Sequence, residues 1–190
     1  MVDRRSVLKL GAAGVAGALV CMPAPVIGAV QAASSRLRGA VFAARFEQGV
    51  AFSQELQRRN VLVSSAGHDI AKLWYGDLRA ALSRHAPIAG LTDRATLFCL
   101  EELARSECMR VLYRVDHRID EQGNAQHSAV GPASVMQAAS RLTPKSAFGR
   151  EMAILAAQFD LSQSSNMAAL KRTGPFSPRT NIALVSWVIA

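Results

Sequence analysis

Short apolar runs alternate with stretches of helical periodicity along much of the chain. Four mostly apolar runs occupy residues 39–44, 61–63, 87–91 and 109–115. Continuous apolar runs of this length are typical of strands that are buried on both faces. Between the runs, apolar side chains recur every three or four residues, which predicts a helix after each of the first three strands. Strand–helix units joined by short connections favour a mostly parallel sheet with helices on both faces.

The most regular helical spacing lies in the second of these helices. Apolar side chains recur there every four residues, at Ile70, Trp74, Leu78 and Leu82. Asp69 stands at the expected N-cap. This spacing places Trp74 in the interface between helix and sheet, Tyr75 at the margin of that interface, and Lys72 on the opposite, solvent-facing side.

The regular alternation ends after residue 115. Residues 113–119 and 125–130 flank a polar, turn-like segment and predict a β-hairpin that extends from the fourth strand. The remaining pattern predicts helices from Pro132 and Phe148, a surface loop over residues 161–178 with a short helix at 167–171, and a last buried strand over residues 181–190. We therefore expect an α/β fold with a mostly parallel sheet of about five strands, helices on both faces, and a β-hairpin extension after strand four.

The N-terminal residues carry a targeting pattern. It consists of paired arginines, an aliphatic pair and a lysine, namely Arg4, Arg5, Val7, Leu8 and Lys9. An uncharged stretch rich in Gly and Ala follows over residues 10–30. The pattern resembles a twin-arginine (Tat) signal peptide, with Val7 in place of the more usual Phe. Small residues before the expected cleavage point after Ala32 predict a signal peptide over residues 1–32 and a single α/β domain over residues 33–190.

The resemblance implies that the Tat translocase exports the chain already folded, so that the protein is periplasmic or secreted. Many Tat substrates take up a cofactor before export, but the resemblance names no cofactor for this chain. The alternative is a membrane anchor, because the uncharged stretch is long enough to cross a bilayer. Pro23, Pro25 and several glycines interrupt the stretch, which favours a removable signal over a permanent membrane anchor.

The net charge of the chain bears on whether it binds nucleic acid. The formal net charge is +8, but the basic residues are spread thinly and form no stripe, so we expect no binding of nucleic acid.

Beyond the predicted signal peptide, the cysteines are Cys99 and Cys108. The periplasm permits a disulfide between them, whereas folding in the reducing cytoplasm favours two buried or half-buried free thiols.

Polar residues follow the predicted parallel strands at the sheet edge where such folds bind ligands. Hydroxyl, basic and small residues gather there, namely Arg45, Ser64, Ser65, Gly67, His68, Thr92, Asp93 and Arg94. Hydroxyl and basic groups near helix N-termini suit a small anion, and Thr92 is the expected cap of the helix that follows. For an enzyme, His68 would be the acid/base, with Arg94 and the helix N-terminus as the anion clamp. Each residue also has a structural alternative, such as helix capping or a hydrogen bond to the backbone.

The predicted hairpin carries a second candidate site. His117 and His127 lie on its two arms and would be cross-strand or diagonal neighbours. With Asp116 or Asp120 they would form a weak metal site, but the alternation of side chains along a strand turns Asp116 away from His117. A solvent-exposed hairpin without metal is the favoured alternative.

The predicted domain over residues 33–190 resembles no characterised family. It contains no dinucleotide-binding GxGxxG motif, no phosphate-binding GxxxxGK[ST] motif and no GxSxG nucleophile motif. The favoured hypothesis is an exported protein that binds a small ligand or acts as an accessory to a larger periplasmic enzyme. The alternative is a small periplasmic enzyme that acts on an anionic small molecule. The residues do not decide between these hypotheses, and they determine neither ligand nor oligomeric state.

Overall fold

The computed structural model describes residues 37–67, 69–82, 86–143, 147–163, 168–171 and 180–190. The predicted signal peptide and His68 lie outside the described residues. Within the described part of the chain, none of the helices combines the length and the apolar character that crossing a bilayer requires.

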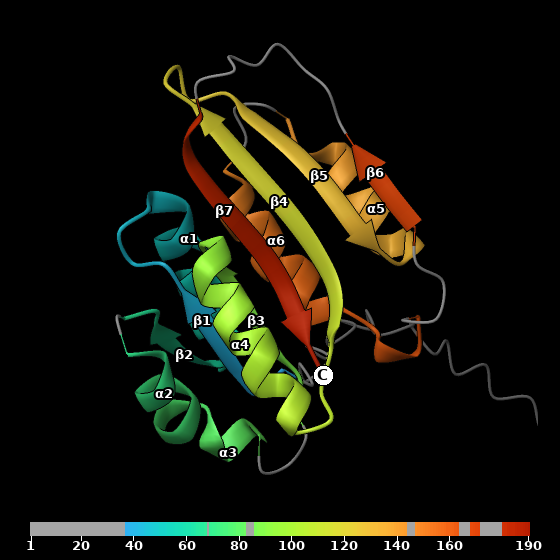
Figure 1. Ribbon diagram of the computed structural model, residues 1–190. Helices are drawn as coiled ribbons and strands as arrows, with labels where there is room; N and C mark the ends of the chain where they lie inside the picture. Colours follow the sequence, from blue (N-terminus) through green and yellow to red (C-terminus); the bar gives the residue numbers. More distant parts are fainter. Residues whose placement is uncertain (1–36, 68, 83–85, 144–146, 164–167, 172–179) are drawn as a thin grey trace, which may run out of the picture. The chain divides into compact units, whose positions relative to one another are not determined.

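The described domain is built on one mixed sheet of seven strands in the order β2-β1-β3-β7-β4-β5-β6 (Figure 1). The strands are β1 (Gly39–Phe42), β2 (Leu62–Ser65), β3 (Ile88–Thr92), β4 (Val111–Asp120), β5 (Ala125–Gly131), β6 (Ala168–Lys171) and β7 (Thr180–Ile189). β1 pairs in parallel with β2 and β3, while the pairings of β3 with β7, β7 with β4, β4 with β5, and β5 with β6 are antiparallel.

The prediction of a mostly parallel sheet of about five strands was therefore wrong. The first four strands do share one direction, because β7 runs antiparallel to both β3 and β4. However, β7 lies between them, so β3 and β4 are not hydrogen-bonded neighbours. The prediction failed because hydropathy shows that a strand is buried but not between which partners it lies. The β-hairpin of β4 and β5 was predicted correctly.

Helices cover both faces of the sheet. They are α1 (Glu47–Arg58), α2 (Ile70–Lys72), α3 (Arg79–Leu82), α4 (Arg94–Ser106), α5 (Ala133–Arg141) and α6 (Phe148–Gln158), with a π-helical turn η1 (Leu73–Asp77) and a 3₁₀ turn η2 (Leu161–Gln163). The helix expected around Trp74 is thus interrupted by η1, although Trp74 is buried as predicted. Tyr75, expected at the margin of the interface, is instead exposed. The helix expected at residues 167–171 is instead the edge strand β6, which pairs with β5.

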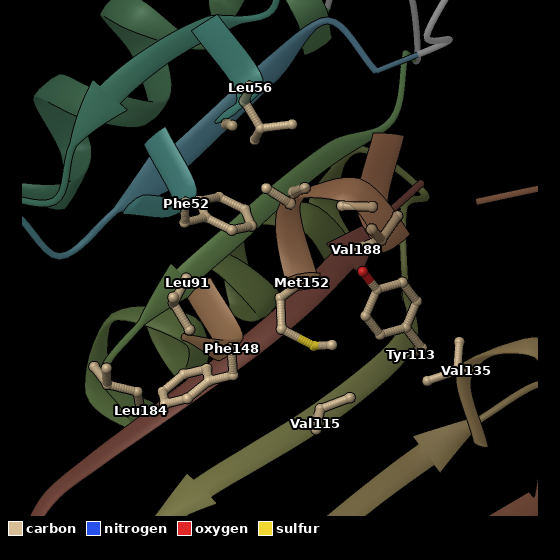
Figure 2. Packing of buried hydrophobic residues seen from close by; sticks show 14 of the residues in the cluster. Phe52, Leu56, Leu91, Tyr113, Val115, Val135, Phe148, Met152, Leu184 and Val188 are labelled. Atoms are coloured by element: carbon tan, nitrogen blue, oxygen red, sulfur yellow. The ribbon is translucent and has the colours of Figure 1, made fainter. Parts of the chain in front are cut away.

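Two hydrophobic cores lie on opposite faces of the sheet. On one face, Phe52 and Leu56 of α1 and Phe148 and Met152 of α6 belong to one core with side chains of the sheet, among which Leu184 lies beside Phe148 (Figure 2). The other face is covered by the segment from η1 to α3 and by α4. Its core includes Trp74, Leu78, Leu97, Leu100 and Trp187.

α1 and α6 cross closely. A Cβ atom on Gly149 would overlap the carbonyl oxygen of Gln48, so this crossing requires glycine. Beside the crossing, the buried carboxylate of Glu55 accepts hydrogen bonds from Arg150 Nε at 3.1 Å and Arg59 Nε at 3.0 Å. Burial by itself would raise the pKa of Glu55, but the hydrogen bonds from Arg150 and Arg59 lower it below its ordinary value. The charge of Glu55 therefore joins the two helices.

Candidate functional site

A cavity of about 290 Å³ lies where the chain leaves the parallel strands β1, β2 and β3. We call it the carboxyl-edge cavity. Its lining comes from the three segments after these strands and comprises Ala43, Ala44, Arg45, Ala66, Gly67, Asp93 and Thr96. These segments meet because parallel strands present their carboxyl ends at the same edge of the sheet. Three of the residues expected at this edge, Arg45, Gly67 and Asp93, therefore lie around one cavity.

Asp93 joins the helix α4 to the loop after β1. Its Oδ1 accepts a hydrogen bond from the backbone N–H of Thr96 at 2.8 Å, which makes Asp93 the N-cap of α4. Its Oδ2 accepts from Arg45 Nη2 at 3.0 Å. The guanidinium of Arg45 also lies 4.7 Å from the ring centroid of Phe46. The carboxylate thus holds the Arg45 cation at the cavity.

Two of the predicted ligand-binding residues have other roles. Thr92 is fully buried, its Oγ1 accepts a hydrogen bond from Trp187 Nε1 at 3.0 Å, and it donates to the carbonyl of Asp93 at 3.1 Å. Arg94 forms an ion pair with Asp116 of β4 at 2.9 Å. Neither residue lines the carboxyl-edge cavity, and the cap expected at Thr92 is provided by Asp93.

The serines predicted at the edge after the second strand do not line the cavity. Ser64 and Ser65 belong to the edge strand β2, paired with Val41 and Phe42, and neither lines the cavity. A Cβ atom on Gly67 would have no neighbour within 4 Å, so the backbone there is open to a ligand.

The histidines of the hairpin are buried rather than exposed to solvent. His117 and His127 are directly paired across β4 and β5, and their Nδ1 atoms are 2.7 Å apart. His117 Nε2 lies 2.7 Å from Ser186 Oγ of β7, and the ring of Phe148 stacks on His117 at 4.2 Å. The expectation of a solvent-exposed hairpin was wrong for the face that carries the histidines, because β7 pairs with β4 and α6 covers this face. The alternation of Tyr113, Val115 and His117 along β4 is the sequence signal that would have predicted His117 on the buried face.

The histidine pair is built as a hydrogen-bonded structural element. Burial, and then the charge of His127, lower the pKa of His117 well below its ordinary value, so His117 is neutral at pH 7. Both Nδ1 atoms face each other and His117 Nε2 faces Ser186, so these nitrogens hold hydrogen bonds rather than open metal positions. Within the described residues, no three side chains of His, Cys, Asp or Glu gather as metal ligands. Asp120, the other carboxylate considered, accepts from the backbone N–H groups of Gln122 and Asn124 and holds the hairpin turn.

The two cysteines beyond the predicted signal are exposed. Cys99 and Cys108 are free, as expected, but the expectation that they are buried or half-buried was wrong. Cys99 lies on the outer side of α4, while Cys108 follows the end of α4 with a φ of 58°.

Comparison with known proteins adds no relative. The chain matches no protein-family model, no curated protein and no solved structure.

Proposed function

We propose that this protein is an exported binding protein for a small anion, which it holds in the carboxyl-edge cavity. The observation that carries the proposal is the position of Arg45 at a cavity formed by three separate segments. The side chain of Arg45 is 68% exposed, and Asp93 is its hydrogen-bond partner among the described residues. Since a guanidinium has five N–H donors, donors of Arg45 are free to bind an anionic ligand.

The size and chemistry of the cavity support a small ligand. A volume of about 290 Å³ is at the lower end of the range for small-molecule sites. The N-terminus of α4 adds a favourable field for negative charge, and the open backbone at Gly67 allows close approach. Inorganic phosphate, sulfate and short carboxylates have the appropriate size and charge.

The residues that line the cavity favour a binding function over a catalytic one. The titratable side chains among the described lining residues are Arg45 and Asp93, and the two oxygens of Asp93 already accept from the Thr96 N–H and from Arg45. Arg94 was the anion clamp of the enzyme hypothesis, but it pairs with Asp116 instead. His68, the acid/base of that hypothesis, lies outside the described residues, so the proposal does not use it.

Calorimetric titration of the purified chain with inorganic phosphate, sulfate and succinate tests the ligand site. Arg45→Ala should weaken binding of the preferred anion at least about tenfold, because it removes the guanidinium but leaves the Asp93 cap in place. Arg79→Ala removes an exposed arginine from α3 and should leave binding unchanged. Equal affinities of Arg45→Ala and the unmodified chain would contradict the proposed site.

Export is tested separately by a charge-conserving change in the paired arginines. Arg4→Lys combined with Arg5→Lys should leave the precursor in the cytoplasm, because the resemblance implies recognition of guanidinium groups rather than of charge alone. Arg58→Lys combined with Arg59→Lys is a matched control elsewhere in the chain. Cell fractionation and immunoblotting give the readout, and undiminished processed protein in the periplasm of the first variant would contradict the Tat assignment.

A further inference from the structure

The outward face of β4 and β5 is a basic surface that no described helix covers. We call it the arginine face, and it consists of the strand residues Arg114, Asp116, Arg118, Gln126, Ser128 and Val130, together with Arg94 at the start of α4, which forms an ion pair with Asp116. α5 and α6 lie behind these strands, and α4 lies over β3 and β7 (Figure 1). Exposed side chains on a sheet face without a covering layer form a flat surface that a partner can reach.

The strand register gives this face a defined pattern. Arg114 is directly opposite Val130, Asp116 is opposite Ser128, and Arg118 is opposite Gln126. Val130 is 44% exposed, which leaves an apolar side chain beside a cation. Arginine beside exposed apolar surface is a common composition at the centre of protein interfaces.

One carboxylate positions two of the three cations. Asp116 is 10% exposed, and its oxygens lie 2.9 Å from Arg94 Nη2 and 3.3 Å from Arg114 Nε. The two arginine side chains nevertheless remain 53% and 46% exposed. Ion pairing restricts their motion before any partner binds, which lowers the entropic cost of association.

The charge on this face is not balanced by its own residues. Three arginines against one aspartate leave a net charge of +2, and Arg118 has no ion pair among the described residues. The face therefore attracts a negatively charged surface.

We propose that the arginine face docks a carboxylate-rich surface of another protein. Planar guanidinium groups match carboxylates in bidentate geometry, and Val130 supplies an apolar contact that such an interface would bury. Three arginines fall short of the four to eight basic residues typical of a membrane-binding cluster. The face also lacks exposed aromatic side chains for stacking on single-stranded nucleic acid. This interface is distinct from the carboxyl-edge cavity and does not depend on the proposed anion site.

A direct binding measurement tests the proposal. The probe is a fluorescent synthetic peptide of alternating Glu and Thr, whose carboxylates line one side when the peptide is extended. Anisotropy titration of the full chain at low salt should show saturable binding that weakens as salt is added. Arg118→Glu, and Arg114→Glu combined with Arg118→Glu, should each weaken binding at least about tenfold.

Matched variants distinguish this face from general basic charge. Arg79→Glu combined with Arg141→Glu makes the same change in net charge on α3 and α5, away from the arginine face, and should bind the peptide like the unmodified chain. Arg118→Glu removes no described ion pair, so its urea midpoint should remain unchanged. Failure of the unmodified chain to bind at low salt, or an equal loss in the α3 and α5 variant, would overturn the proposal. Tighter, Arg118-dependent binding to phosphatidylglycerol vesicles or to a single-stranded DNA oligonucleotide would also overturn it.

Discussion

His117 and His127 share one short hydrogen bond between their Nδ1 atoms, 2.7 Å apart in the buried pairing of β4 and β5. One ring must carry the proton between them while the other accepts it. If His117 Nδ1 donates, its Nε2 accepts from the hydroxyl of Ser186; if His127 donates, His117 Nε2 donates to Ser186. Either arrangement connects β5, β4 and β7 through hydrogen bonds beside the ring of Phe148.

The histidine pair should make stability depend on pH. The unfolded chain takes up a proton at His117 near its ordinary pKa of 6.5, whereas burial keeps His117 neutral in the folded state to lower pH. The free energy of unfolding should therefore fall as pH drops below 6.5, by at most about 1.4 kcal/mol per pH unit for one proton. Above this pH both states are neutral at His117, so its contribution does not change.

Urea denaturation at several pH values between about 5 and 8 gives the measurement. His117→Gln keeps a hydrogen-bonding side chain but cannot be protonated, so its stability should vary less with pH than that of the unmodified chain. An unchanged pH dependence in this variant would show that other groups cause it.

Thr92 should contribute to stability through its hydroxyl rather than through a ligand. Thr92→Val preserves the shape of the side chain but leaves the buried Trp187 Nε1–H without its acceptor, at a cost of about 1–3 kcal/mol. Thr92→Ser retains the acceptor and should cost less. Urea midpoints compare the variants, and a Val variant as stable as the unmodified chain would contradict the structural role.

The same substitution should have opposite effects at the two exposed cysteines. Cys108 has a φ of 58°, a backbone conformation that costs an L-residue energy, so Cys108→Gly should stabilise the fold by up to about 1 kcal/mol. Cys99 lies within α4, where Cys99→Gly should destabilise by about 0.5–1 kcal/mol. Thermal melts under reducing conditions report both effects, and a destabilised Cys108→Gly variant would contradict the first expectation.

Trp74 should be a major contributor to the core that contains Trp187. It is 1% exposed in the core beneath η1, so Trp74→Ala should cost roughly 3–5 kcal/mol. Lys72, two residues earlier, is exposed, and Lys72→Ala should change stability by no more than about 0.5 kcal/mol. Similar denaturant midpoints for the two variants would contradict the observed orientation of this segment.

Local patterns were sufficient for much of the secondary structure. Helical spacing predicted α1, α4 and α6, and Asp69 was correctly placed as an N-cap, because these features depend on residues close in the chain. The turn-like segment likewise predicted the hairpin. The π-helical turn at Trp74 did not disturb the burial pattern, so the side-chain periodicity gave no sign of it.

The candidate site was predicted in part. Arg45, Gly67 and Asp93 meet at the expected edge because the direction of β1, β2 and β3 follows from their strand–helix connections. The roles of Thr92 and Arg94 could not be predicted, since Trp187 and Asp116 are distant in sequence.

The sequence by itself determined most of the helices and strands, though not the strand β6, and it determined that the first three strands run parallel. Tertiary structure alone decided that β7 enters between β3 and β4, and this one pairing changed the sheet from mostly parallel to mixed. It also placed Ser186 beside His117 and Trp187 beside Thr92. The physical reason is that periodicity reflects which side of an element is buried, whereas the choice of neighbour depends on pairing and packing over the whole chain.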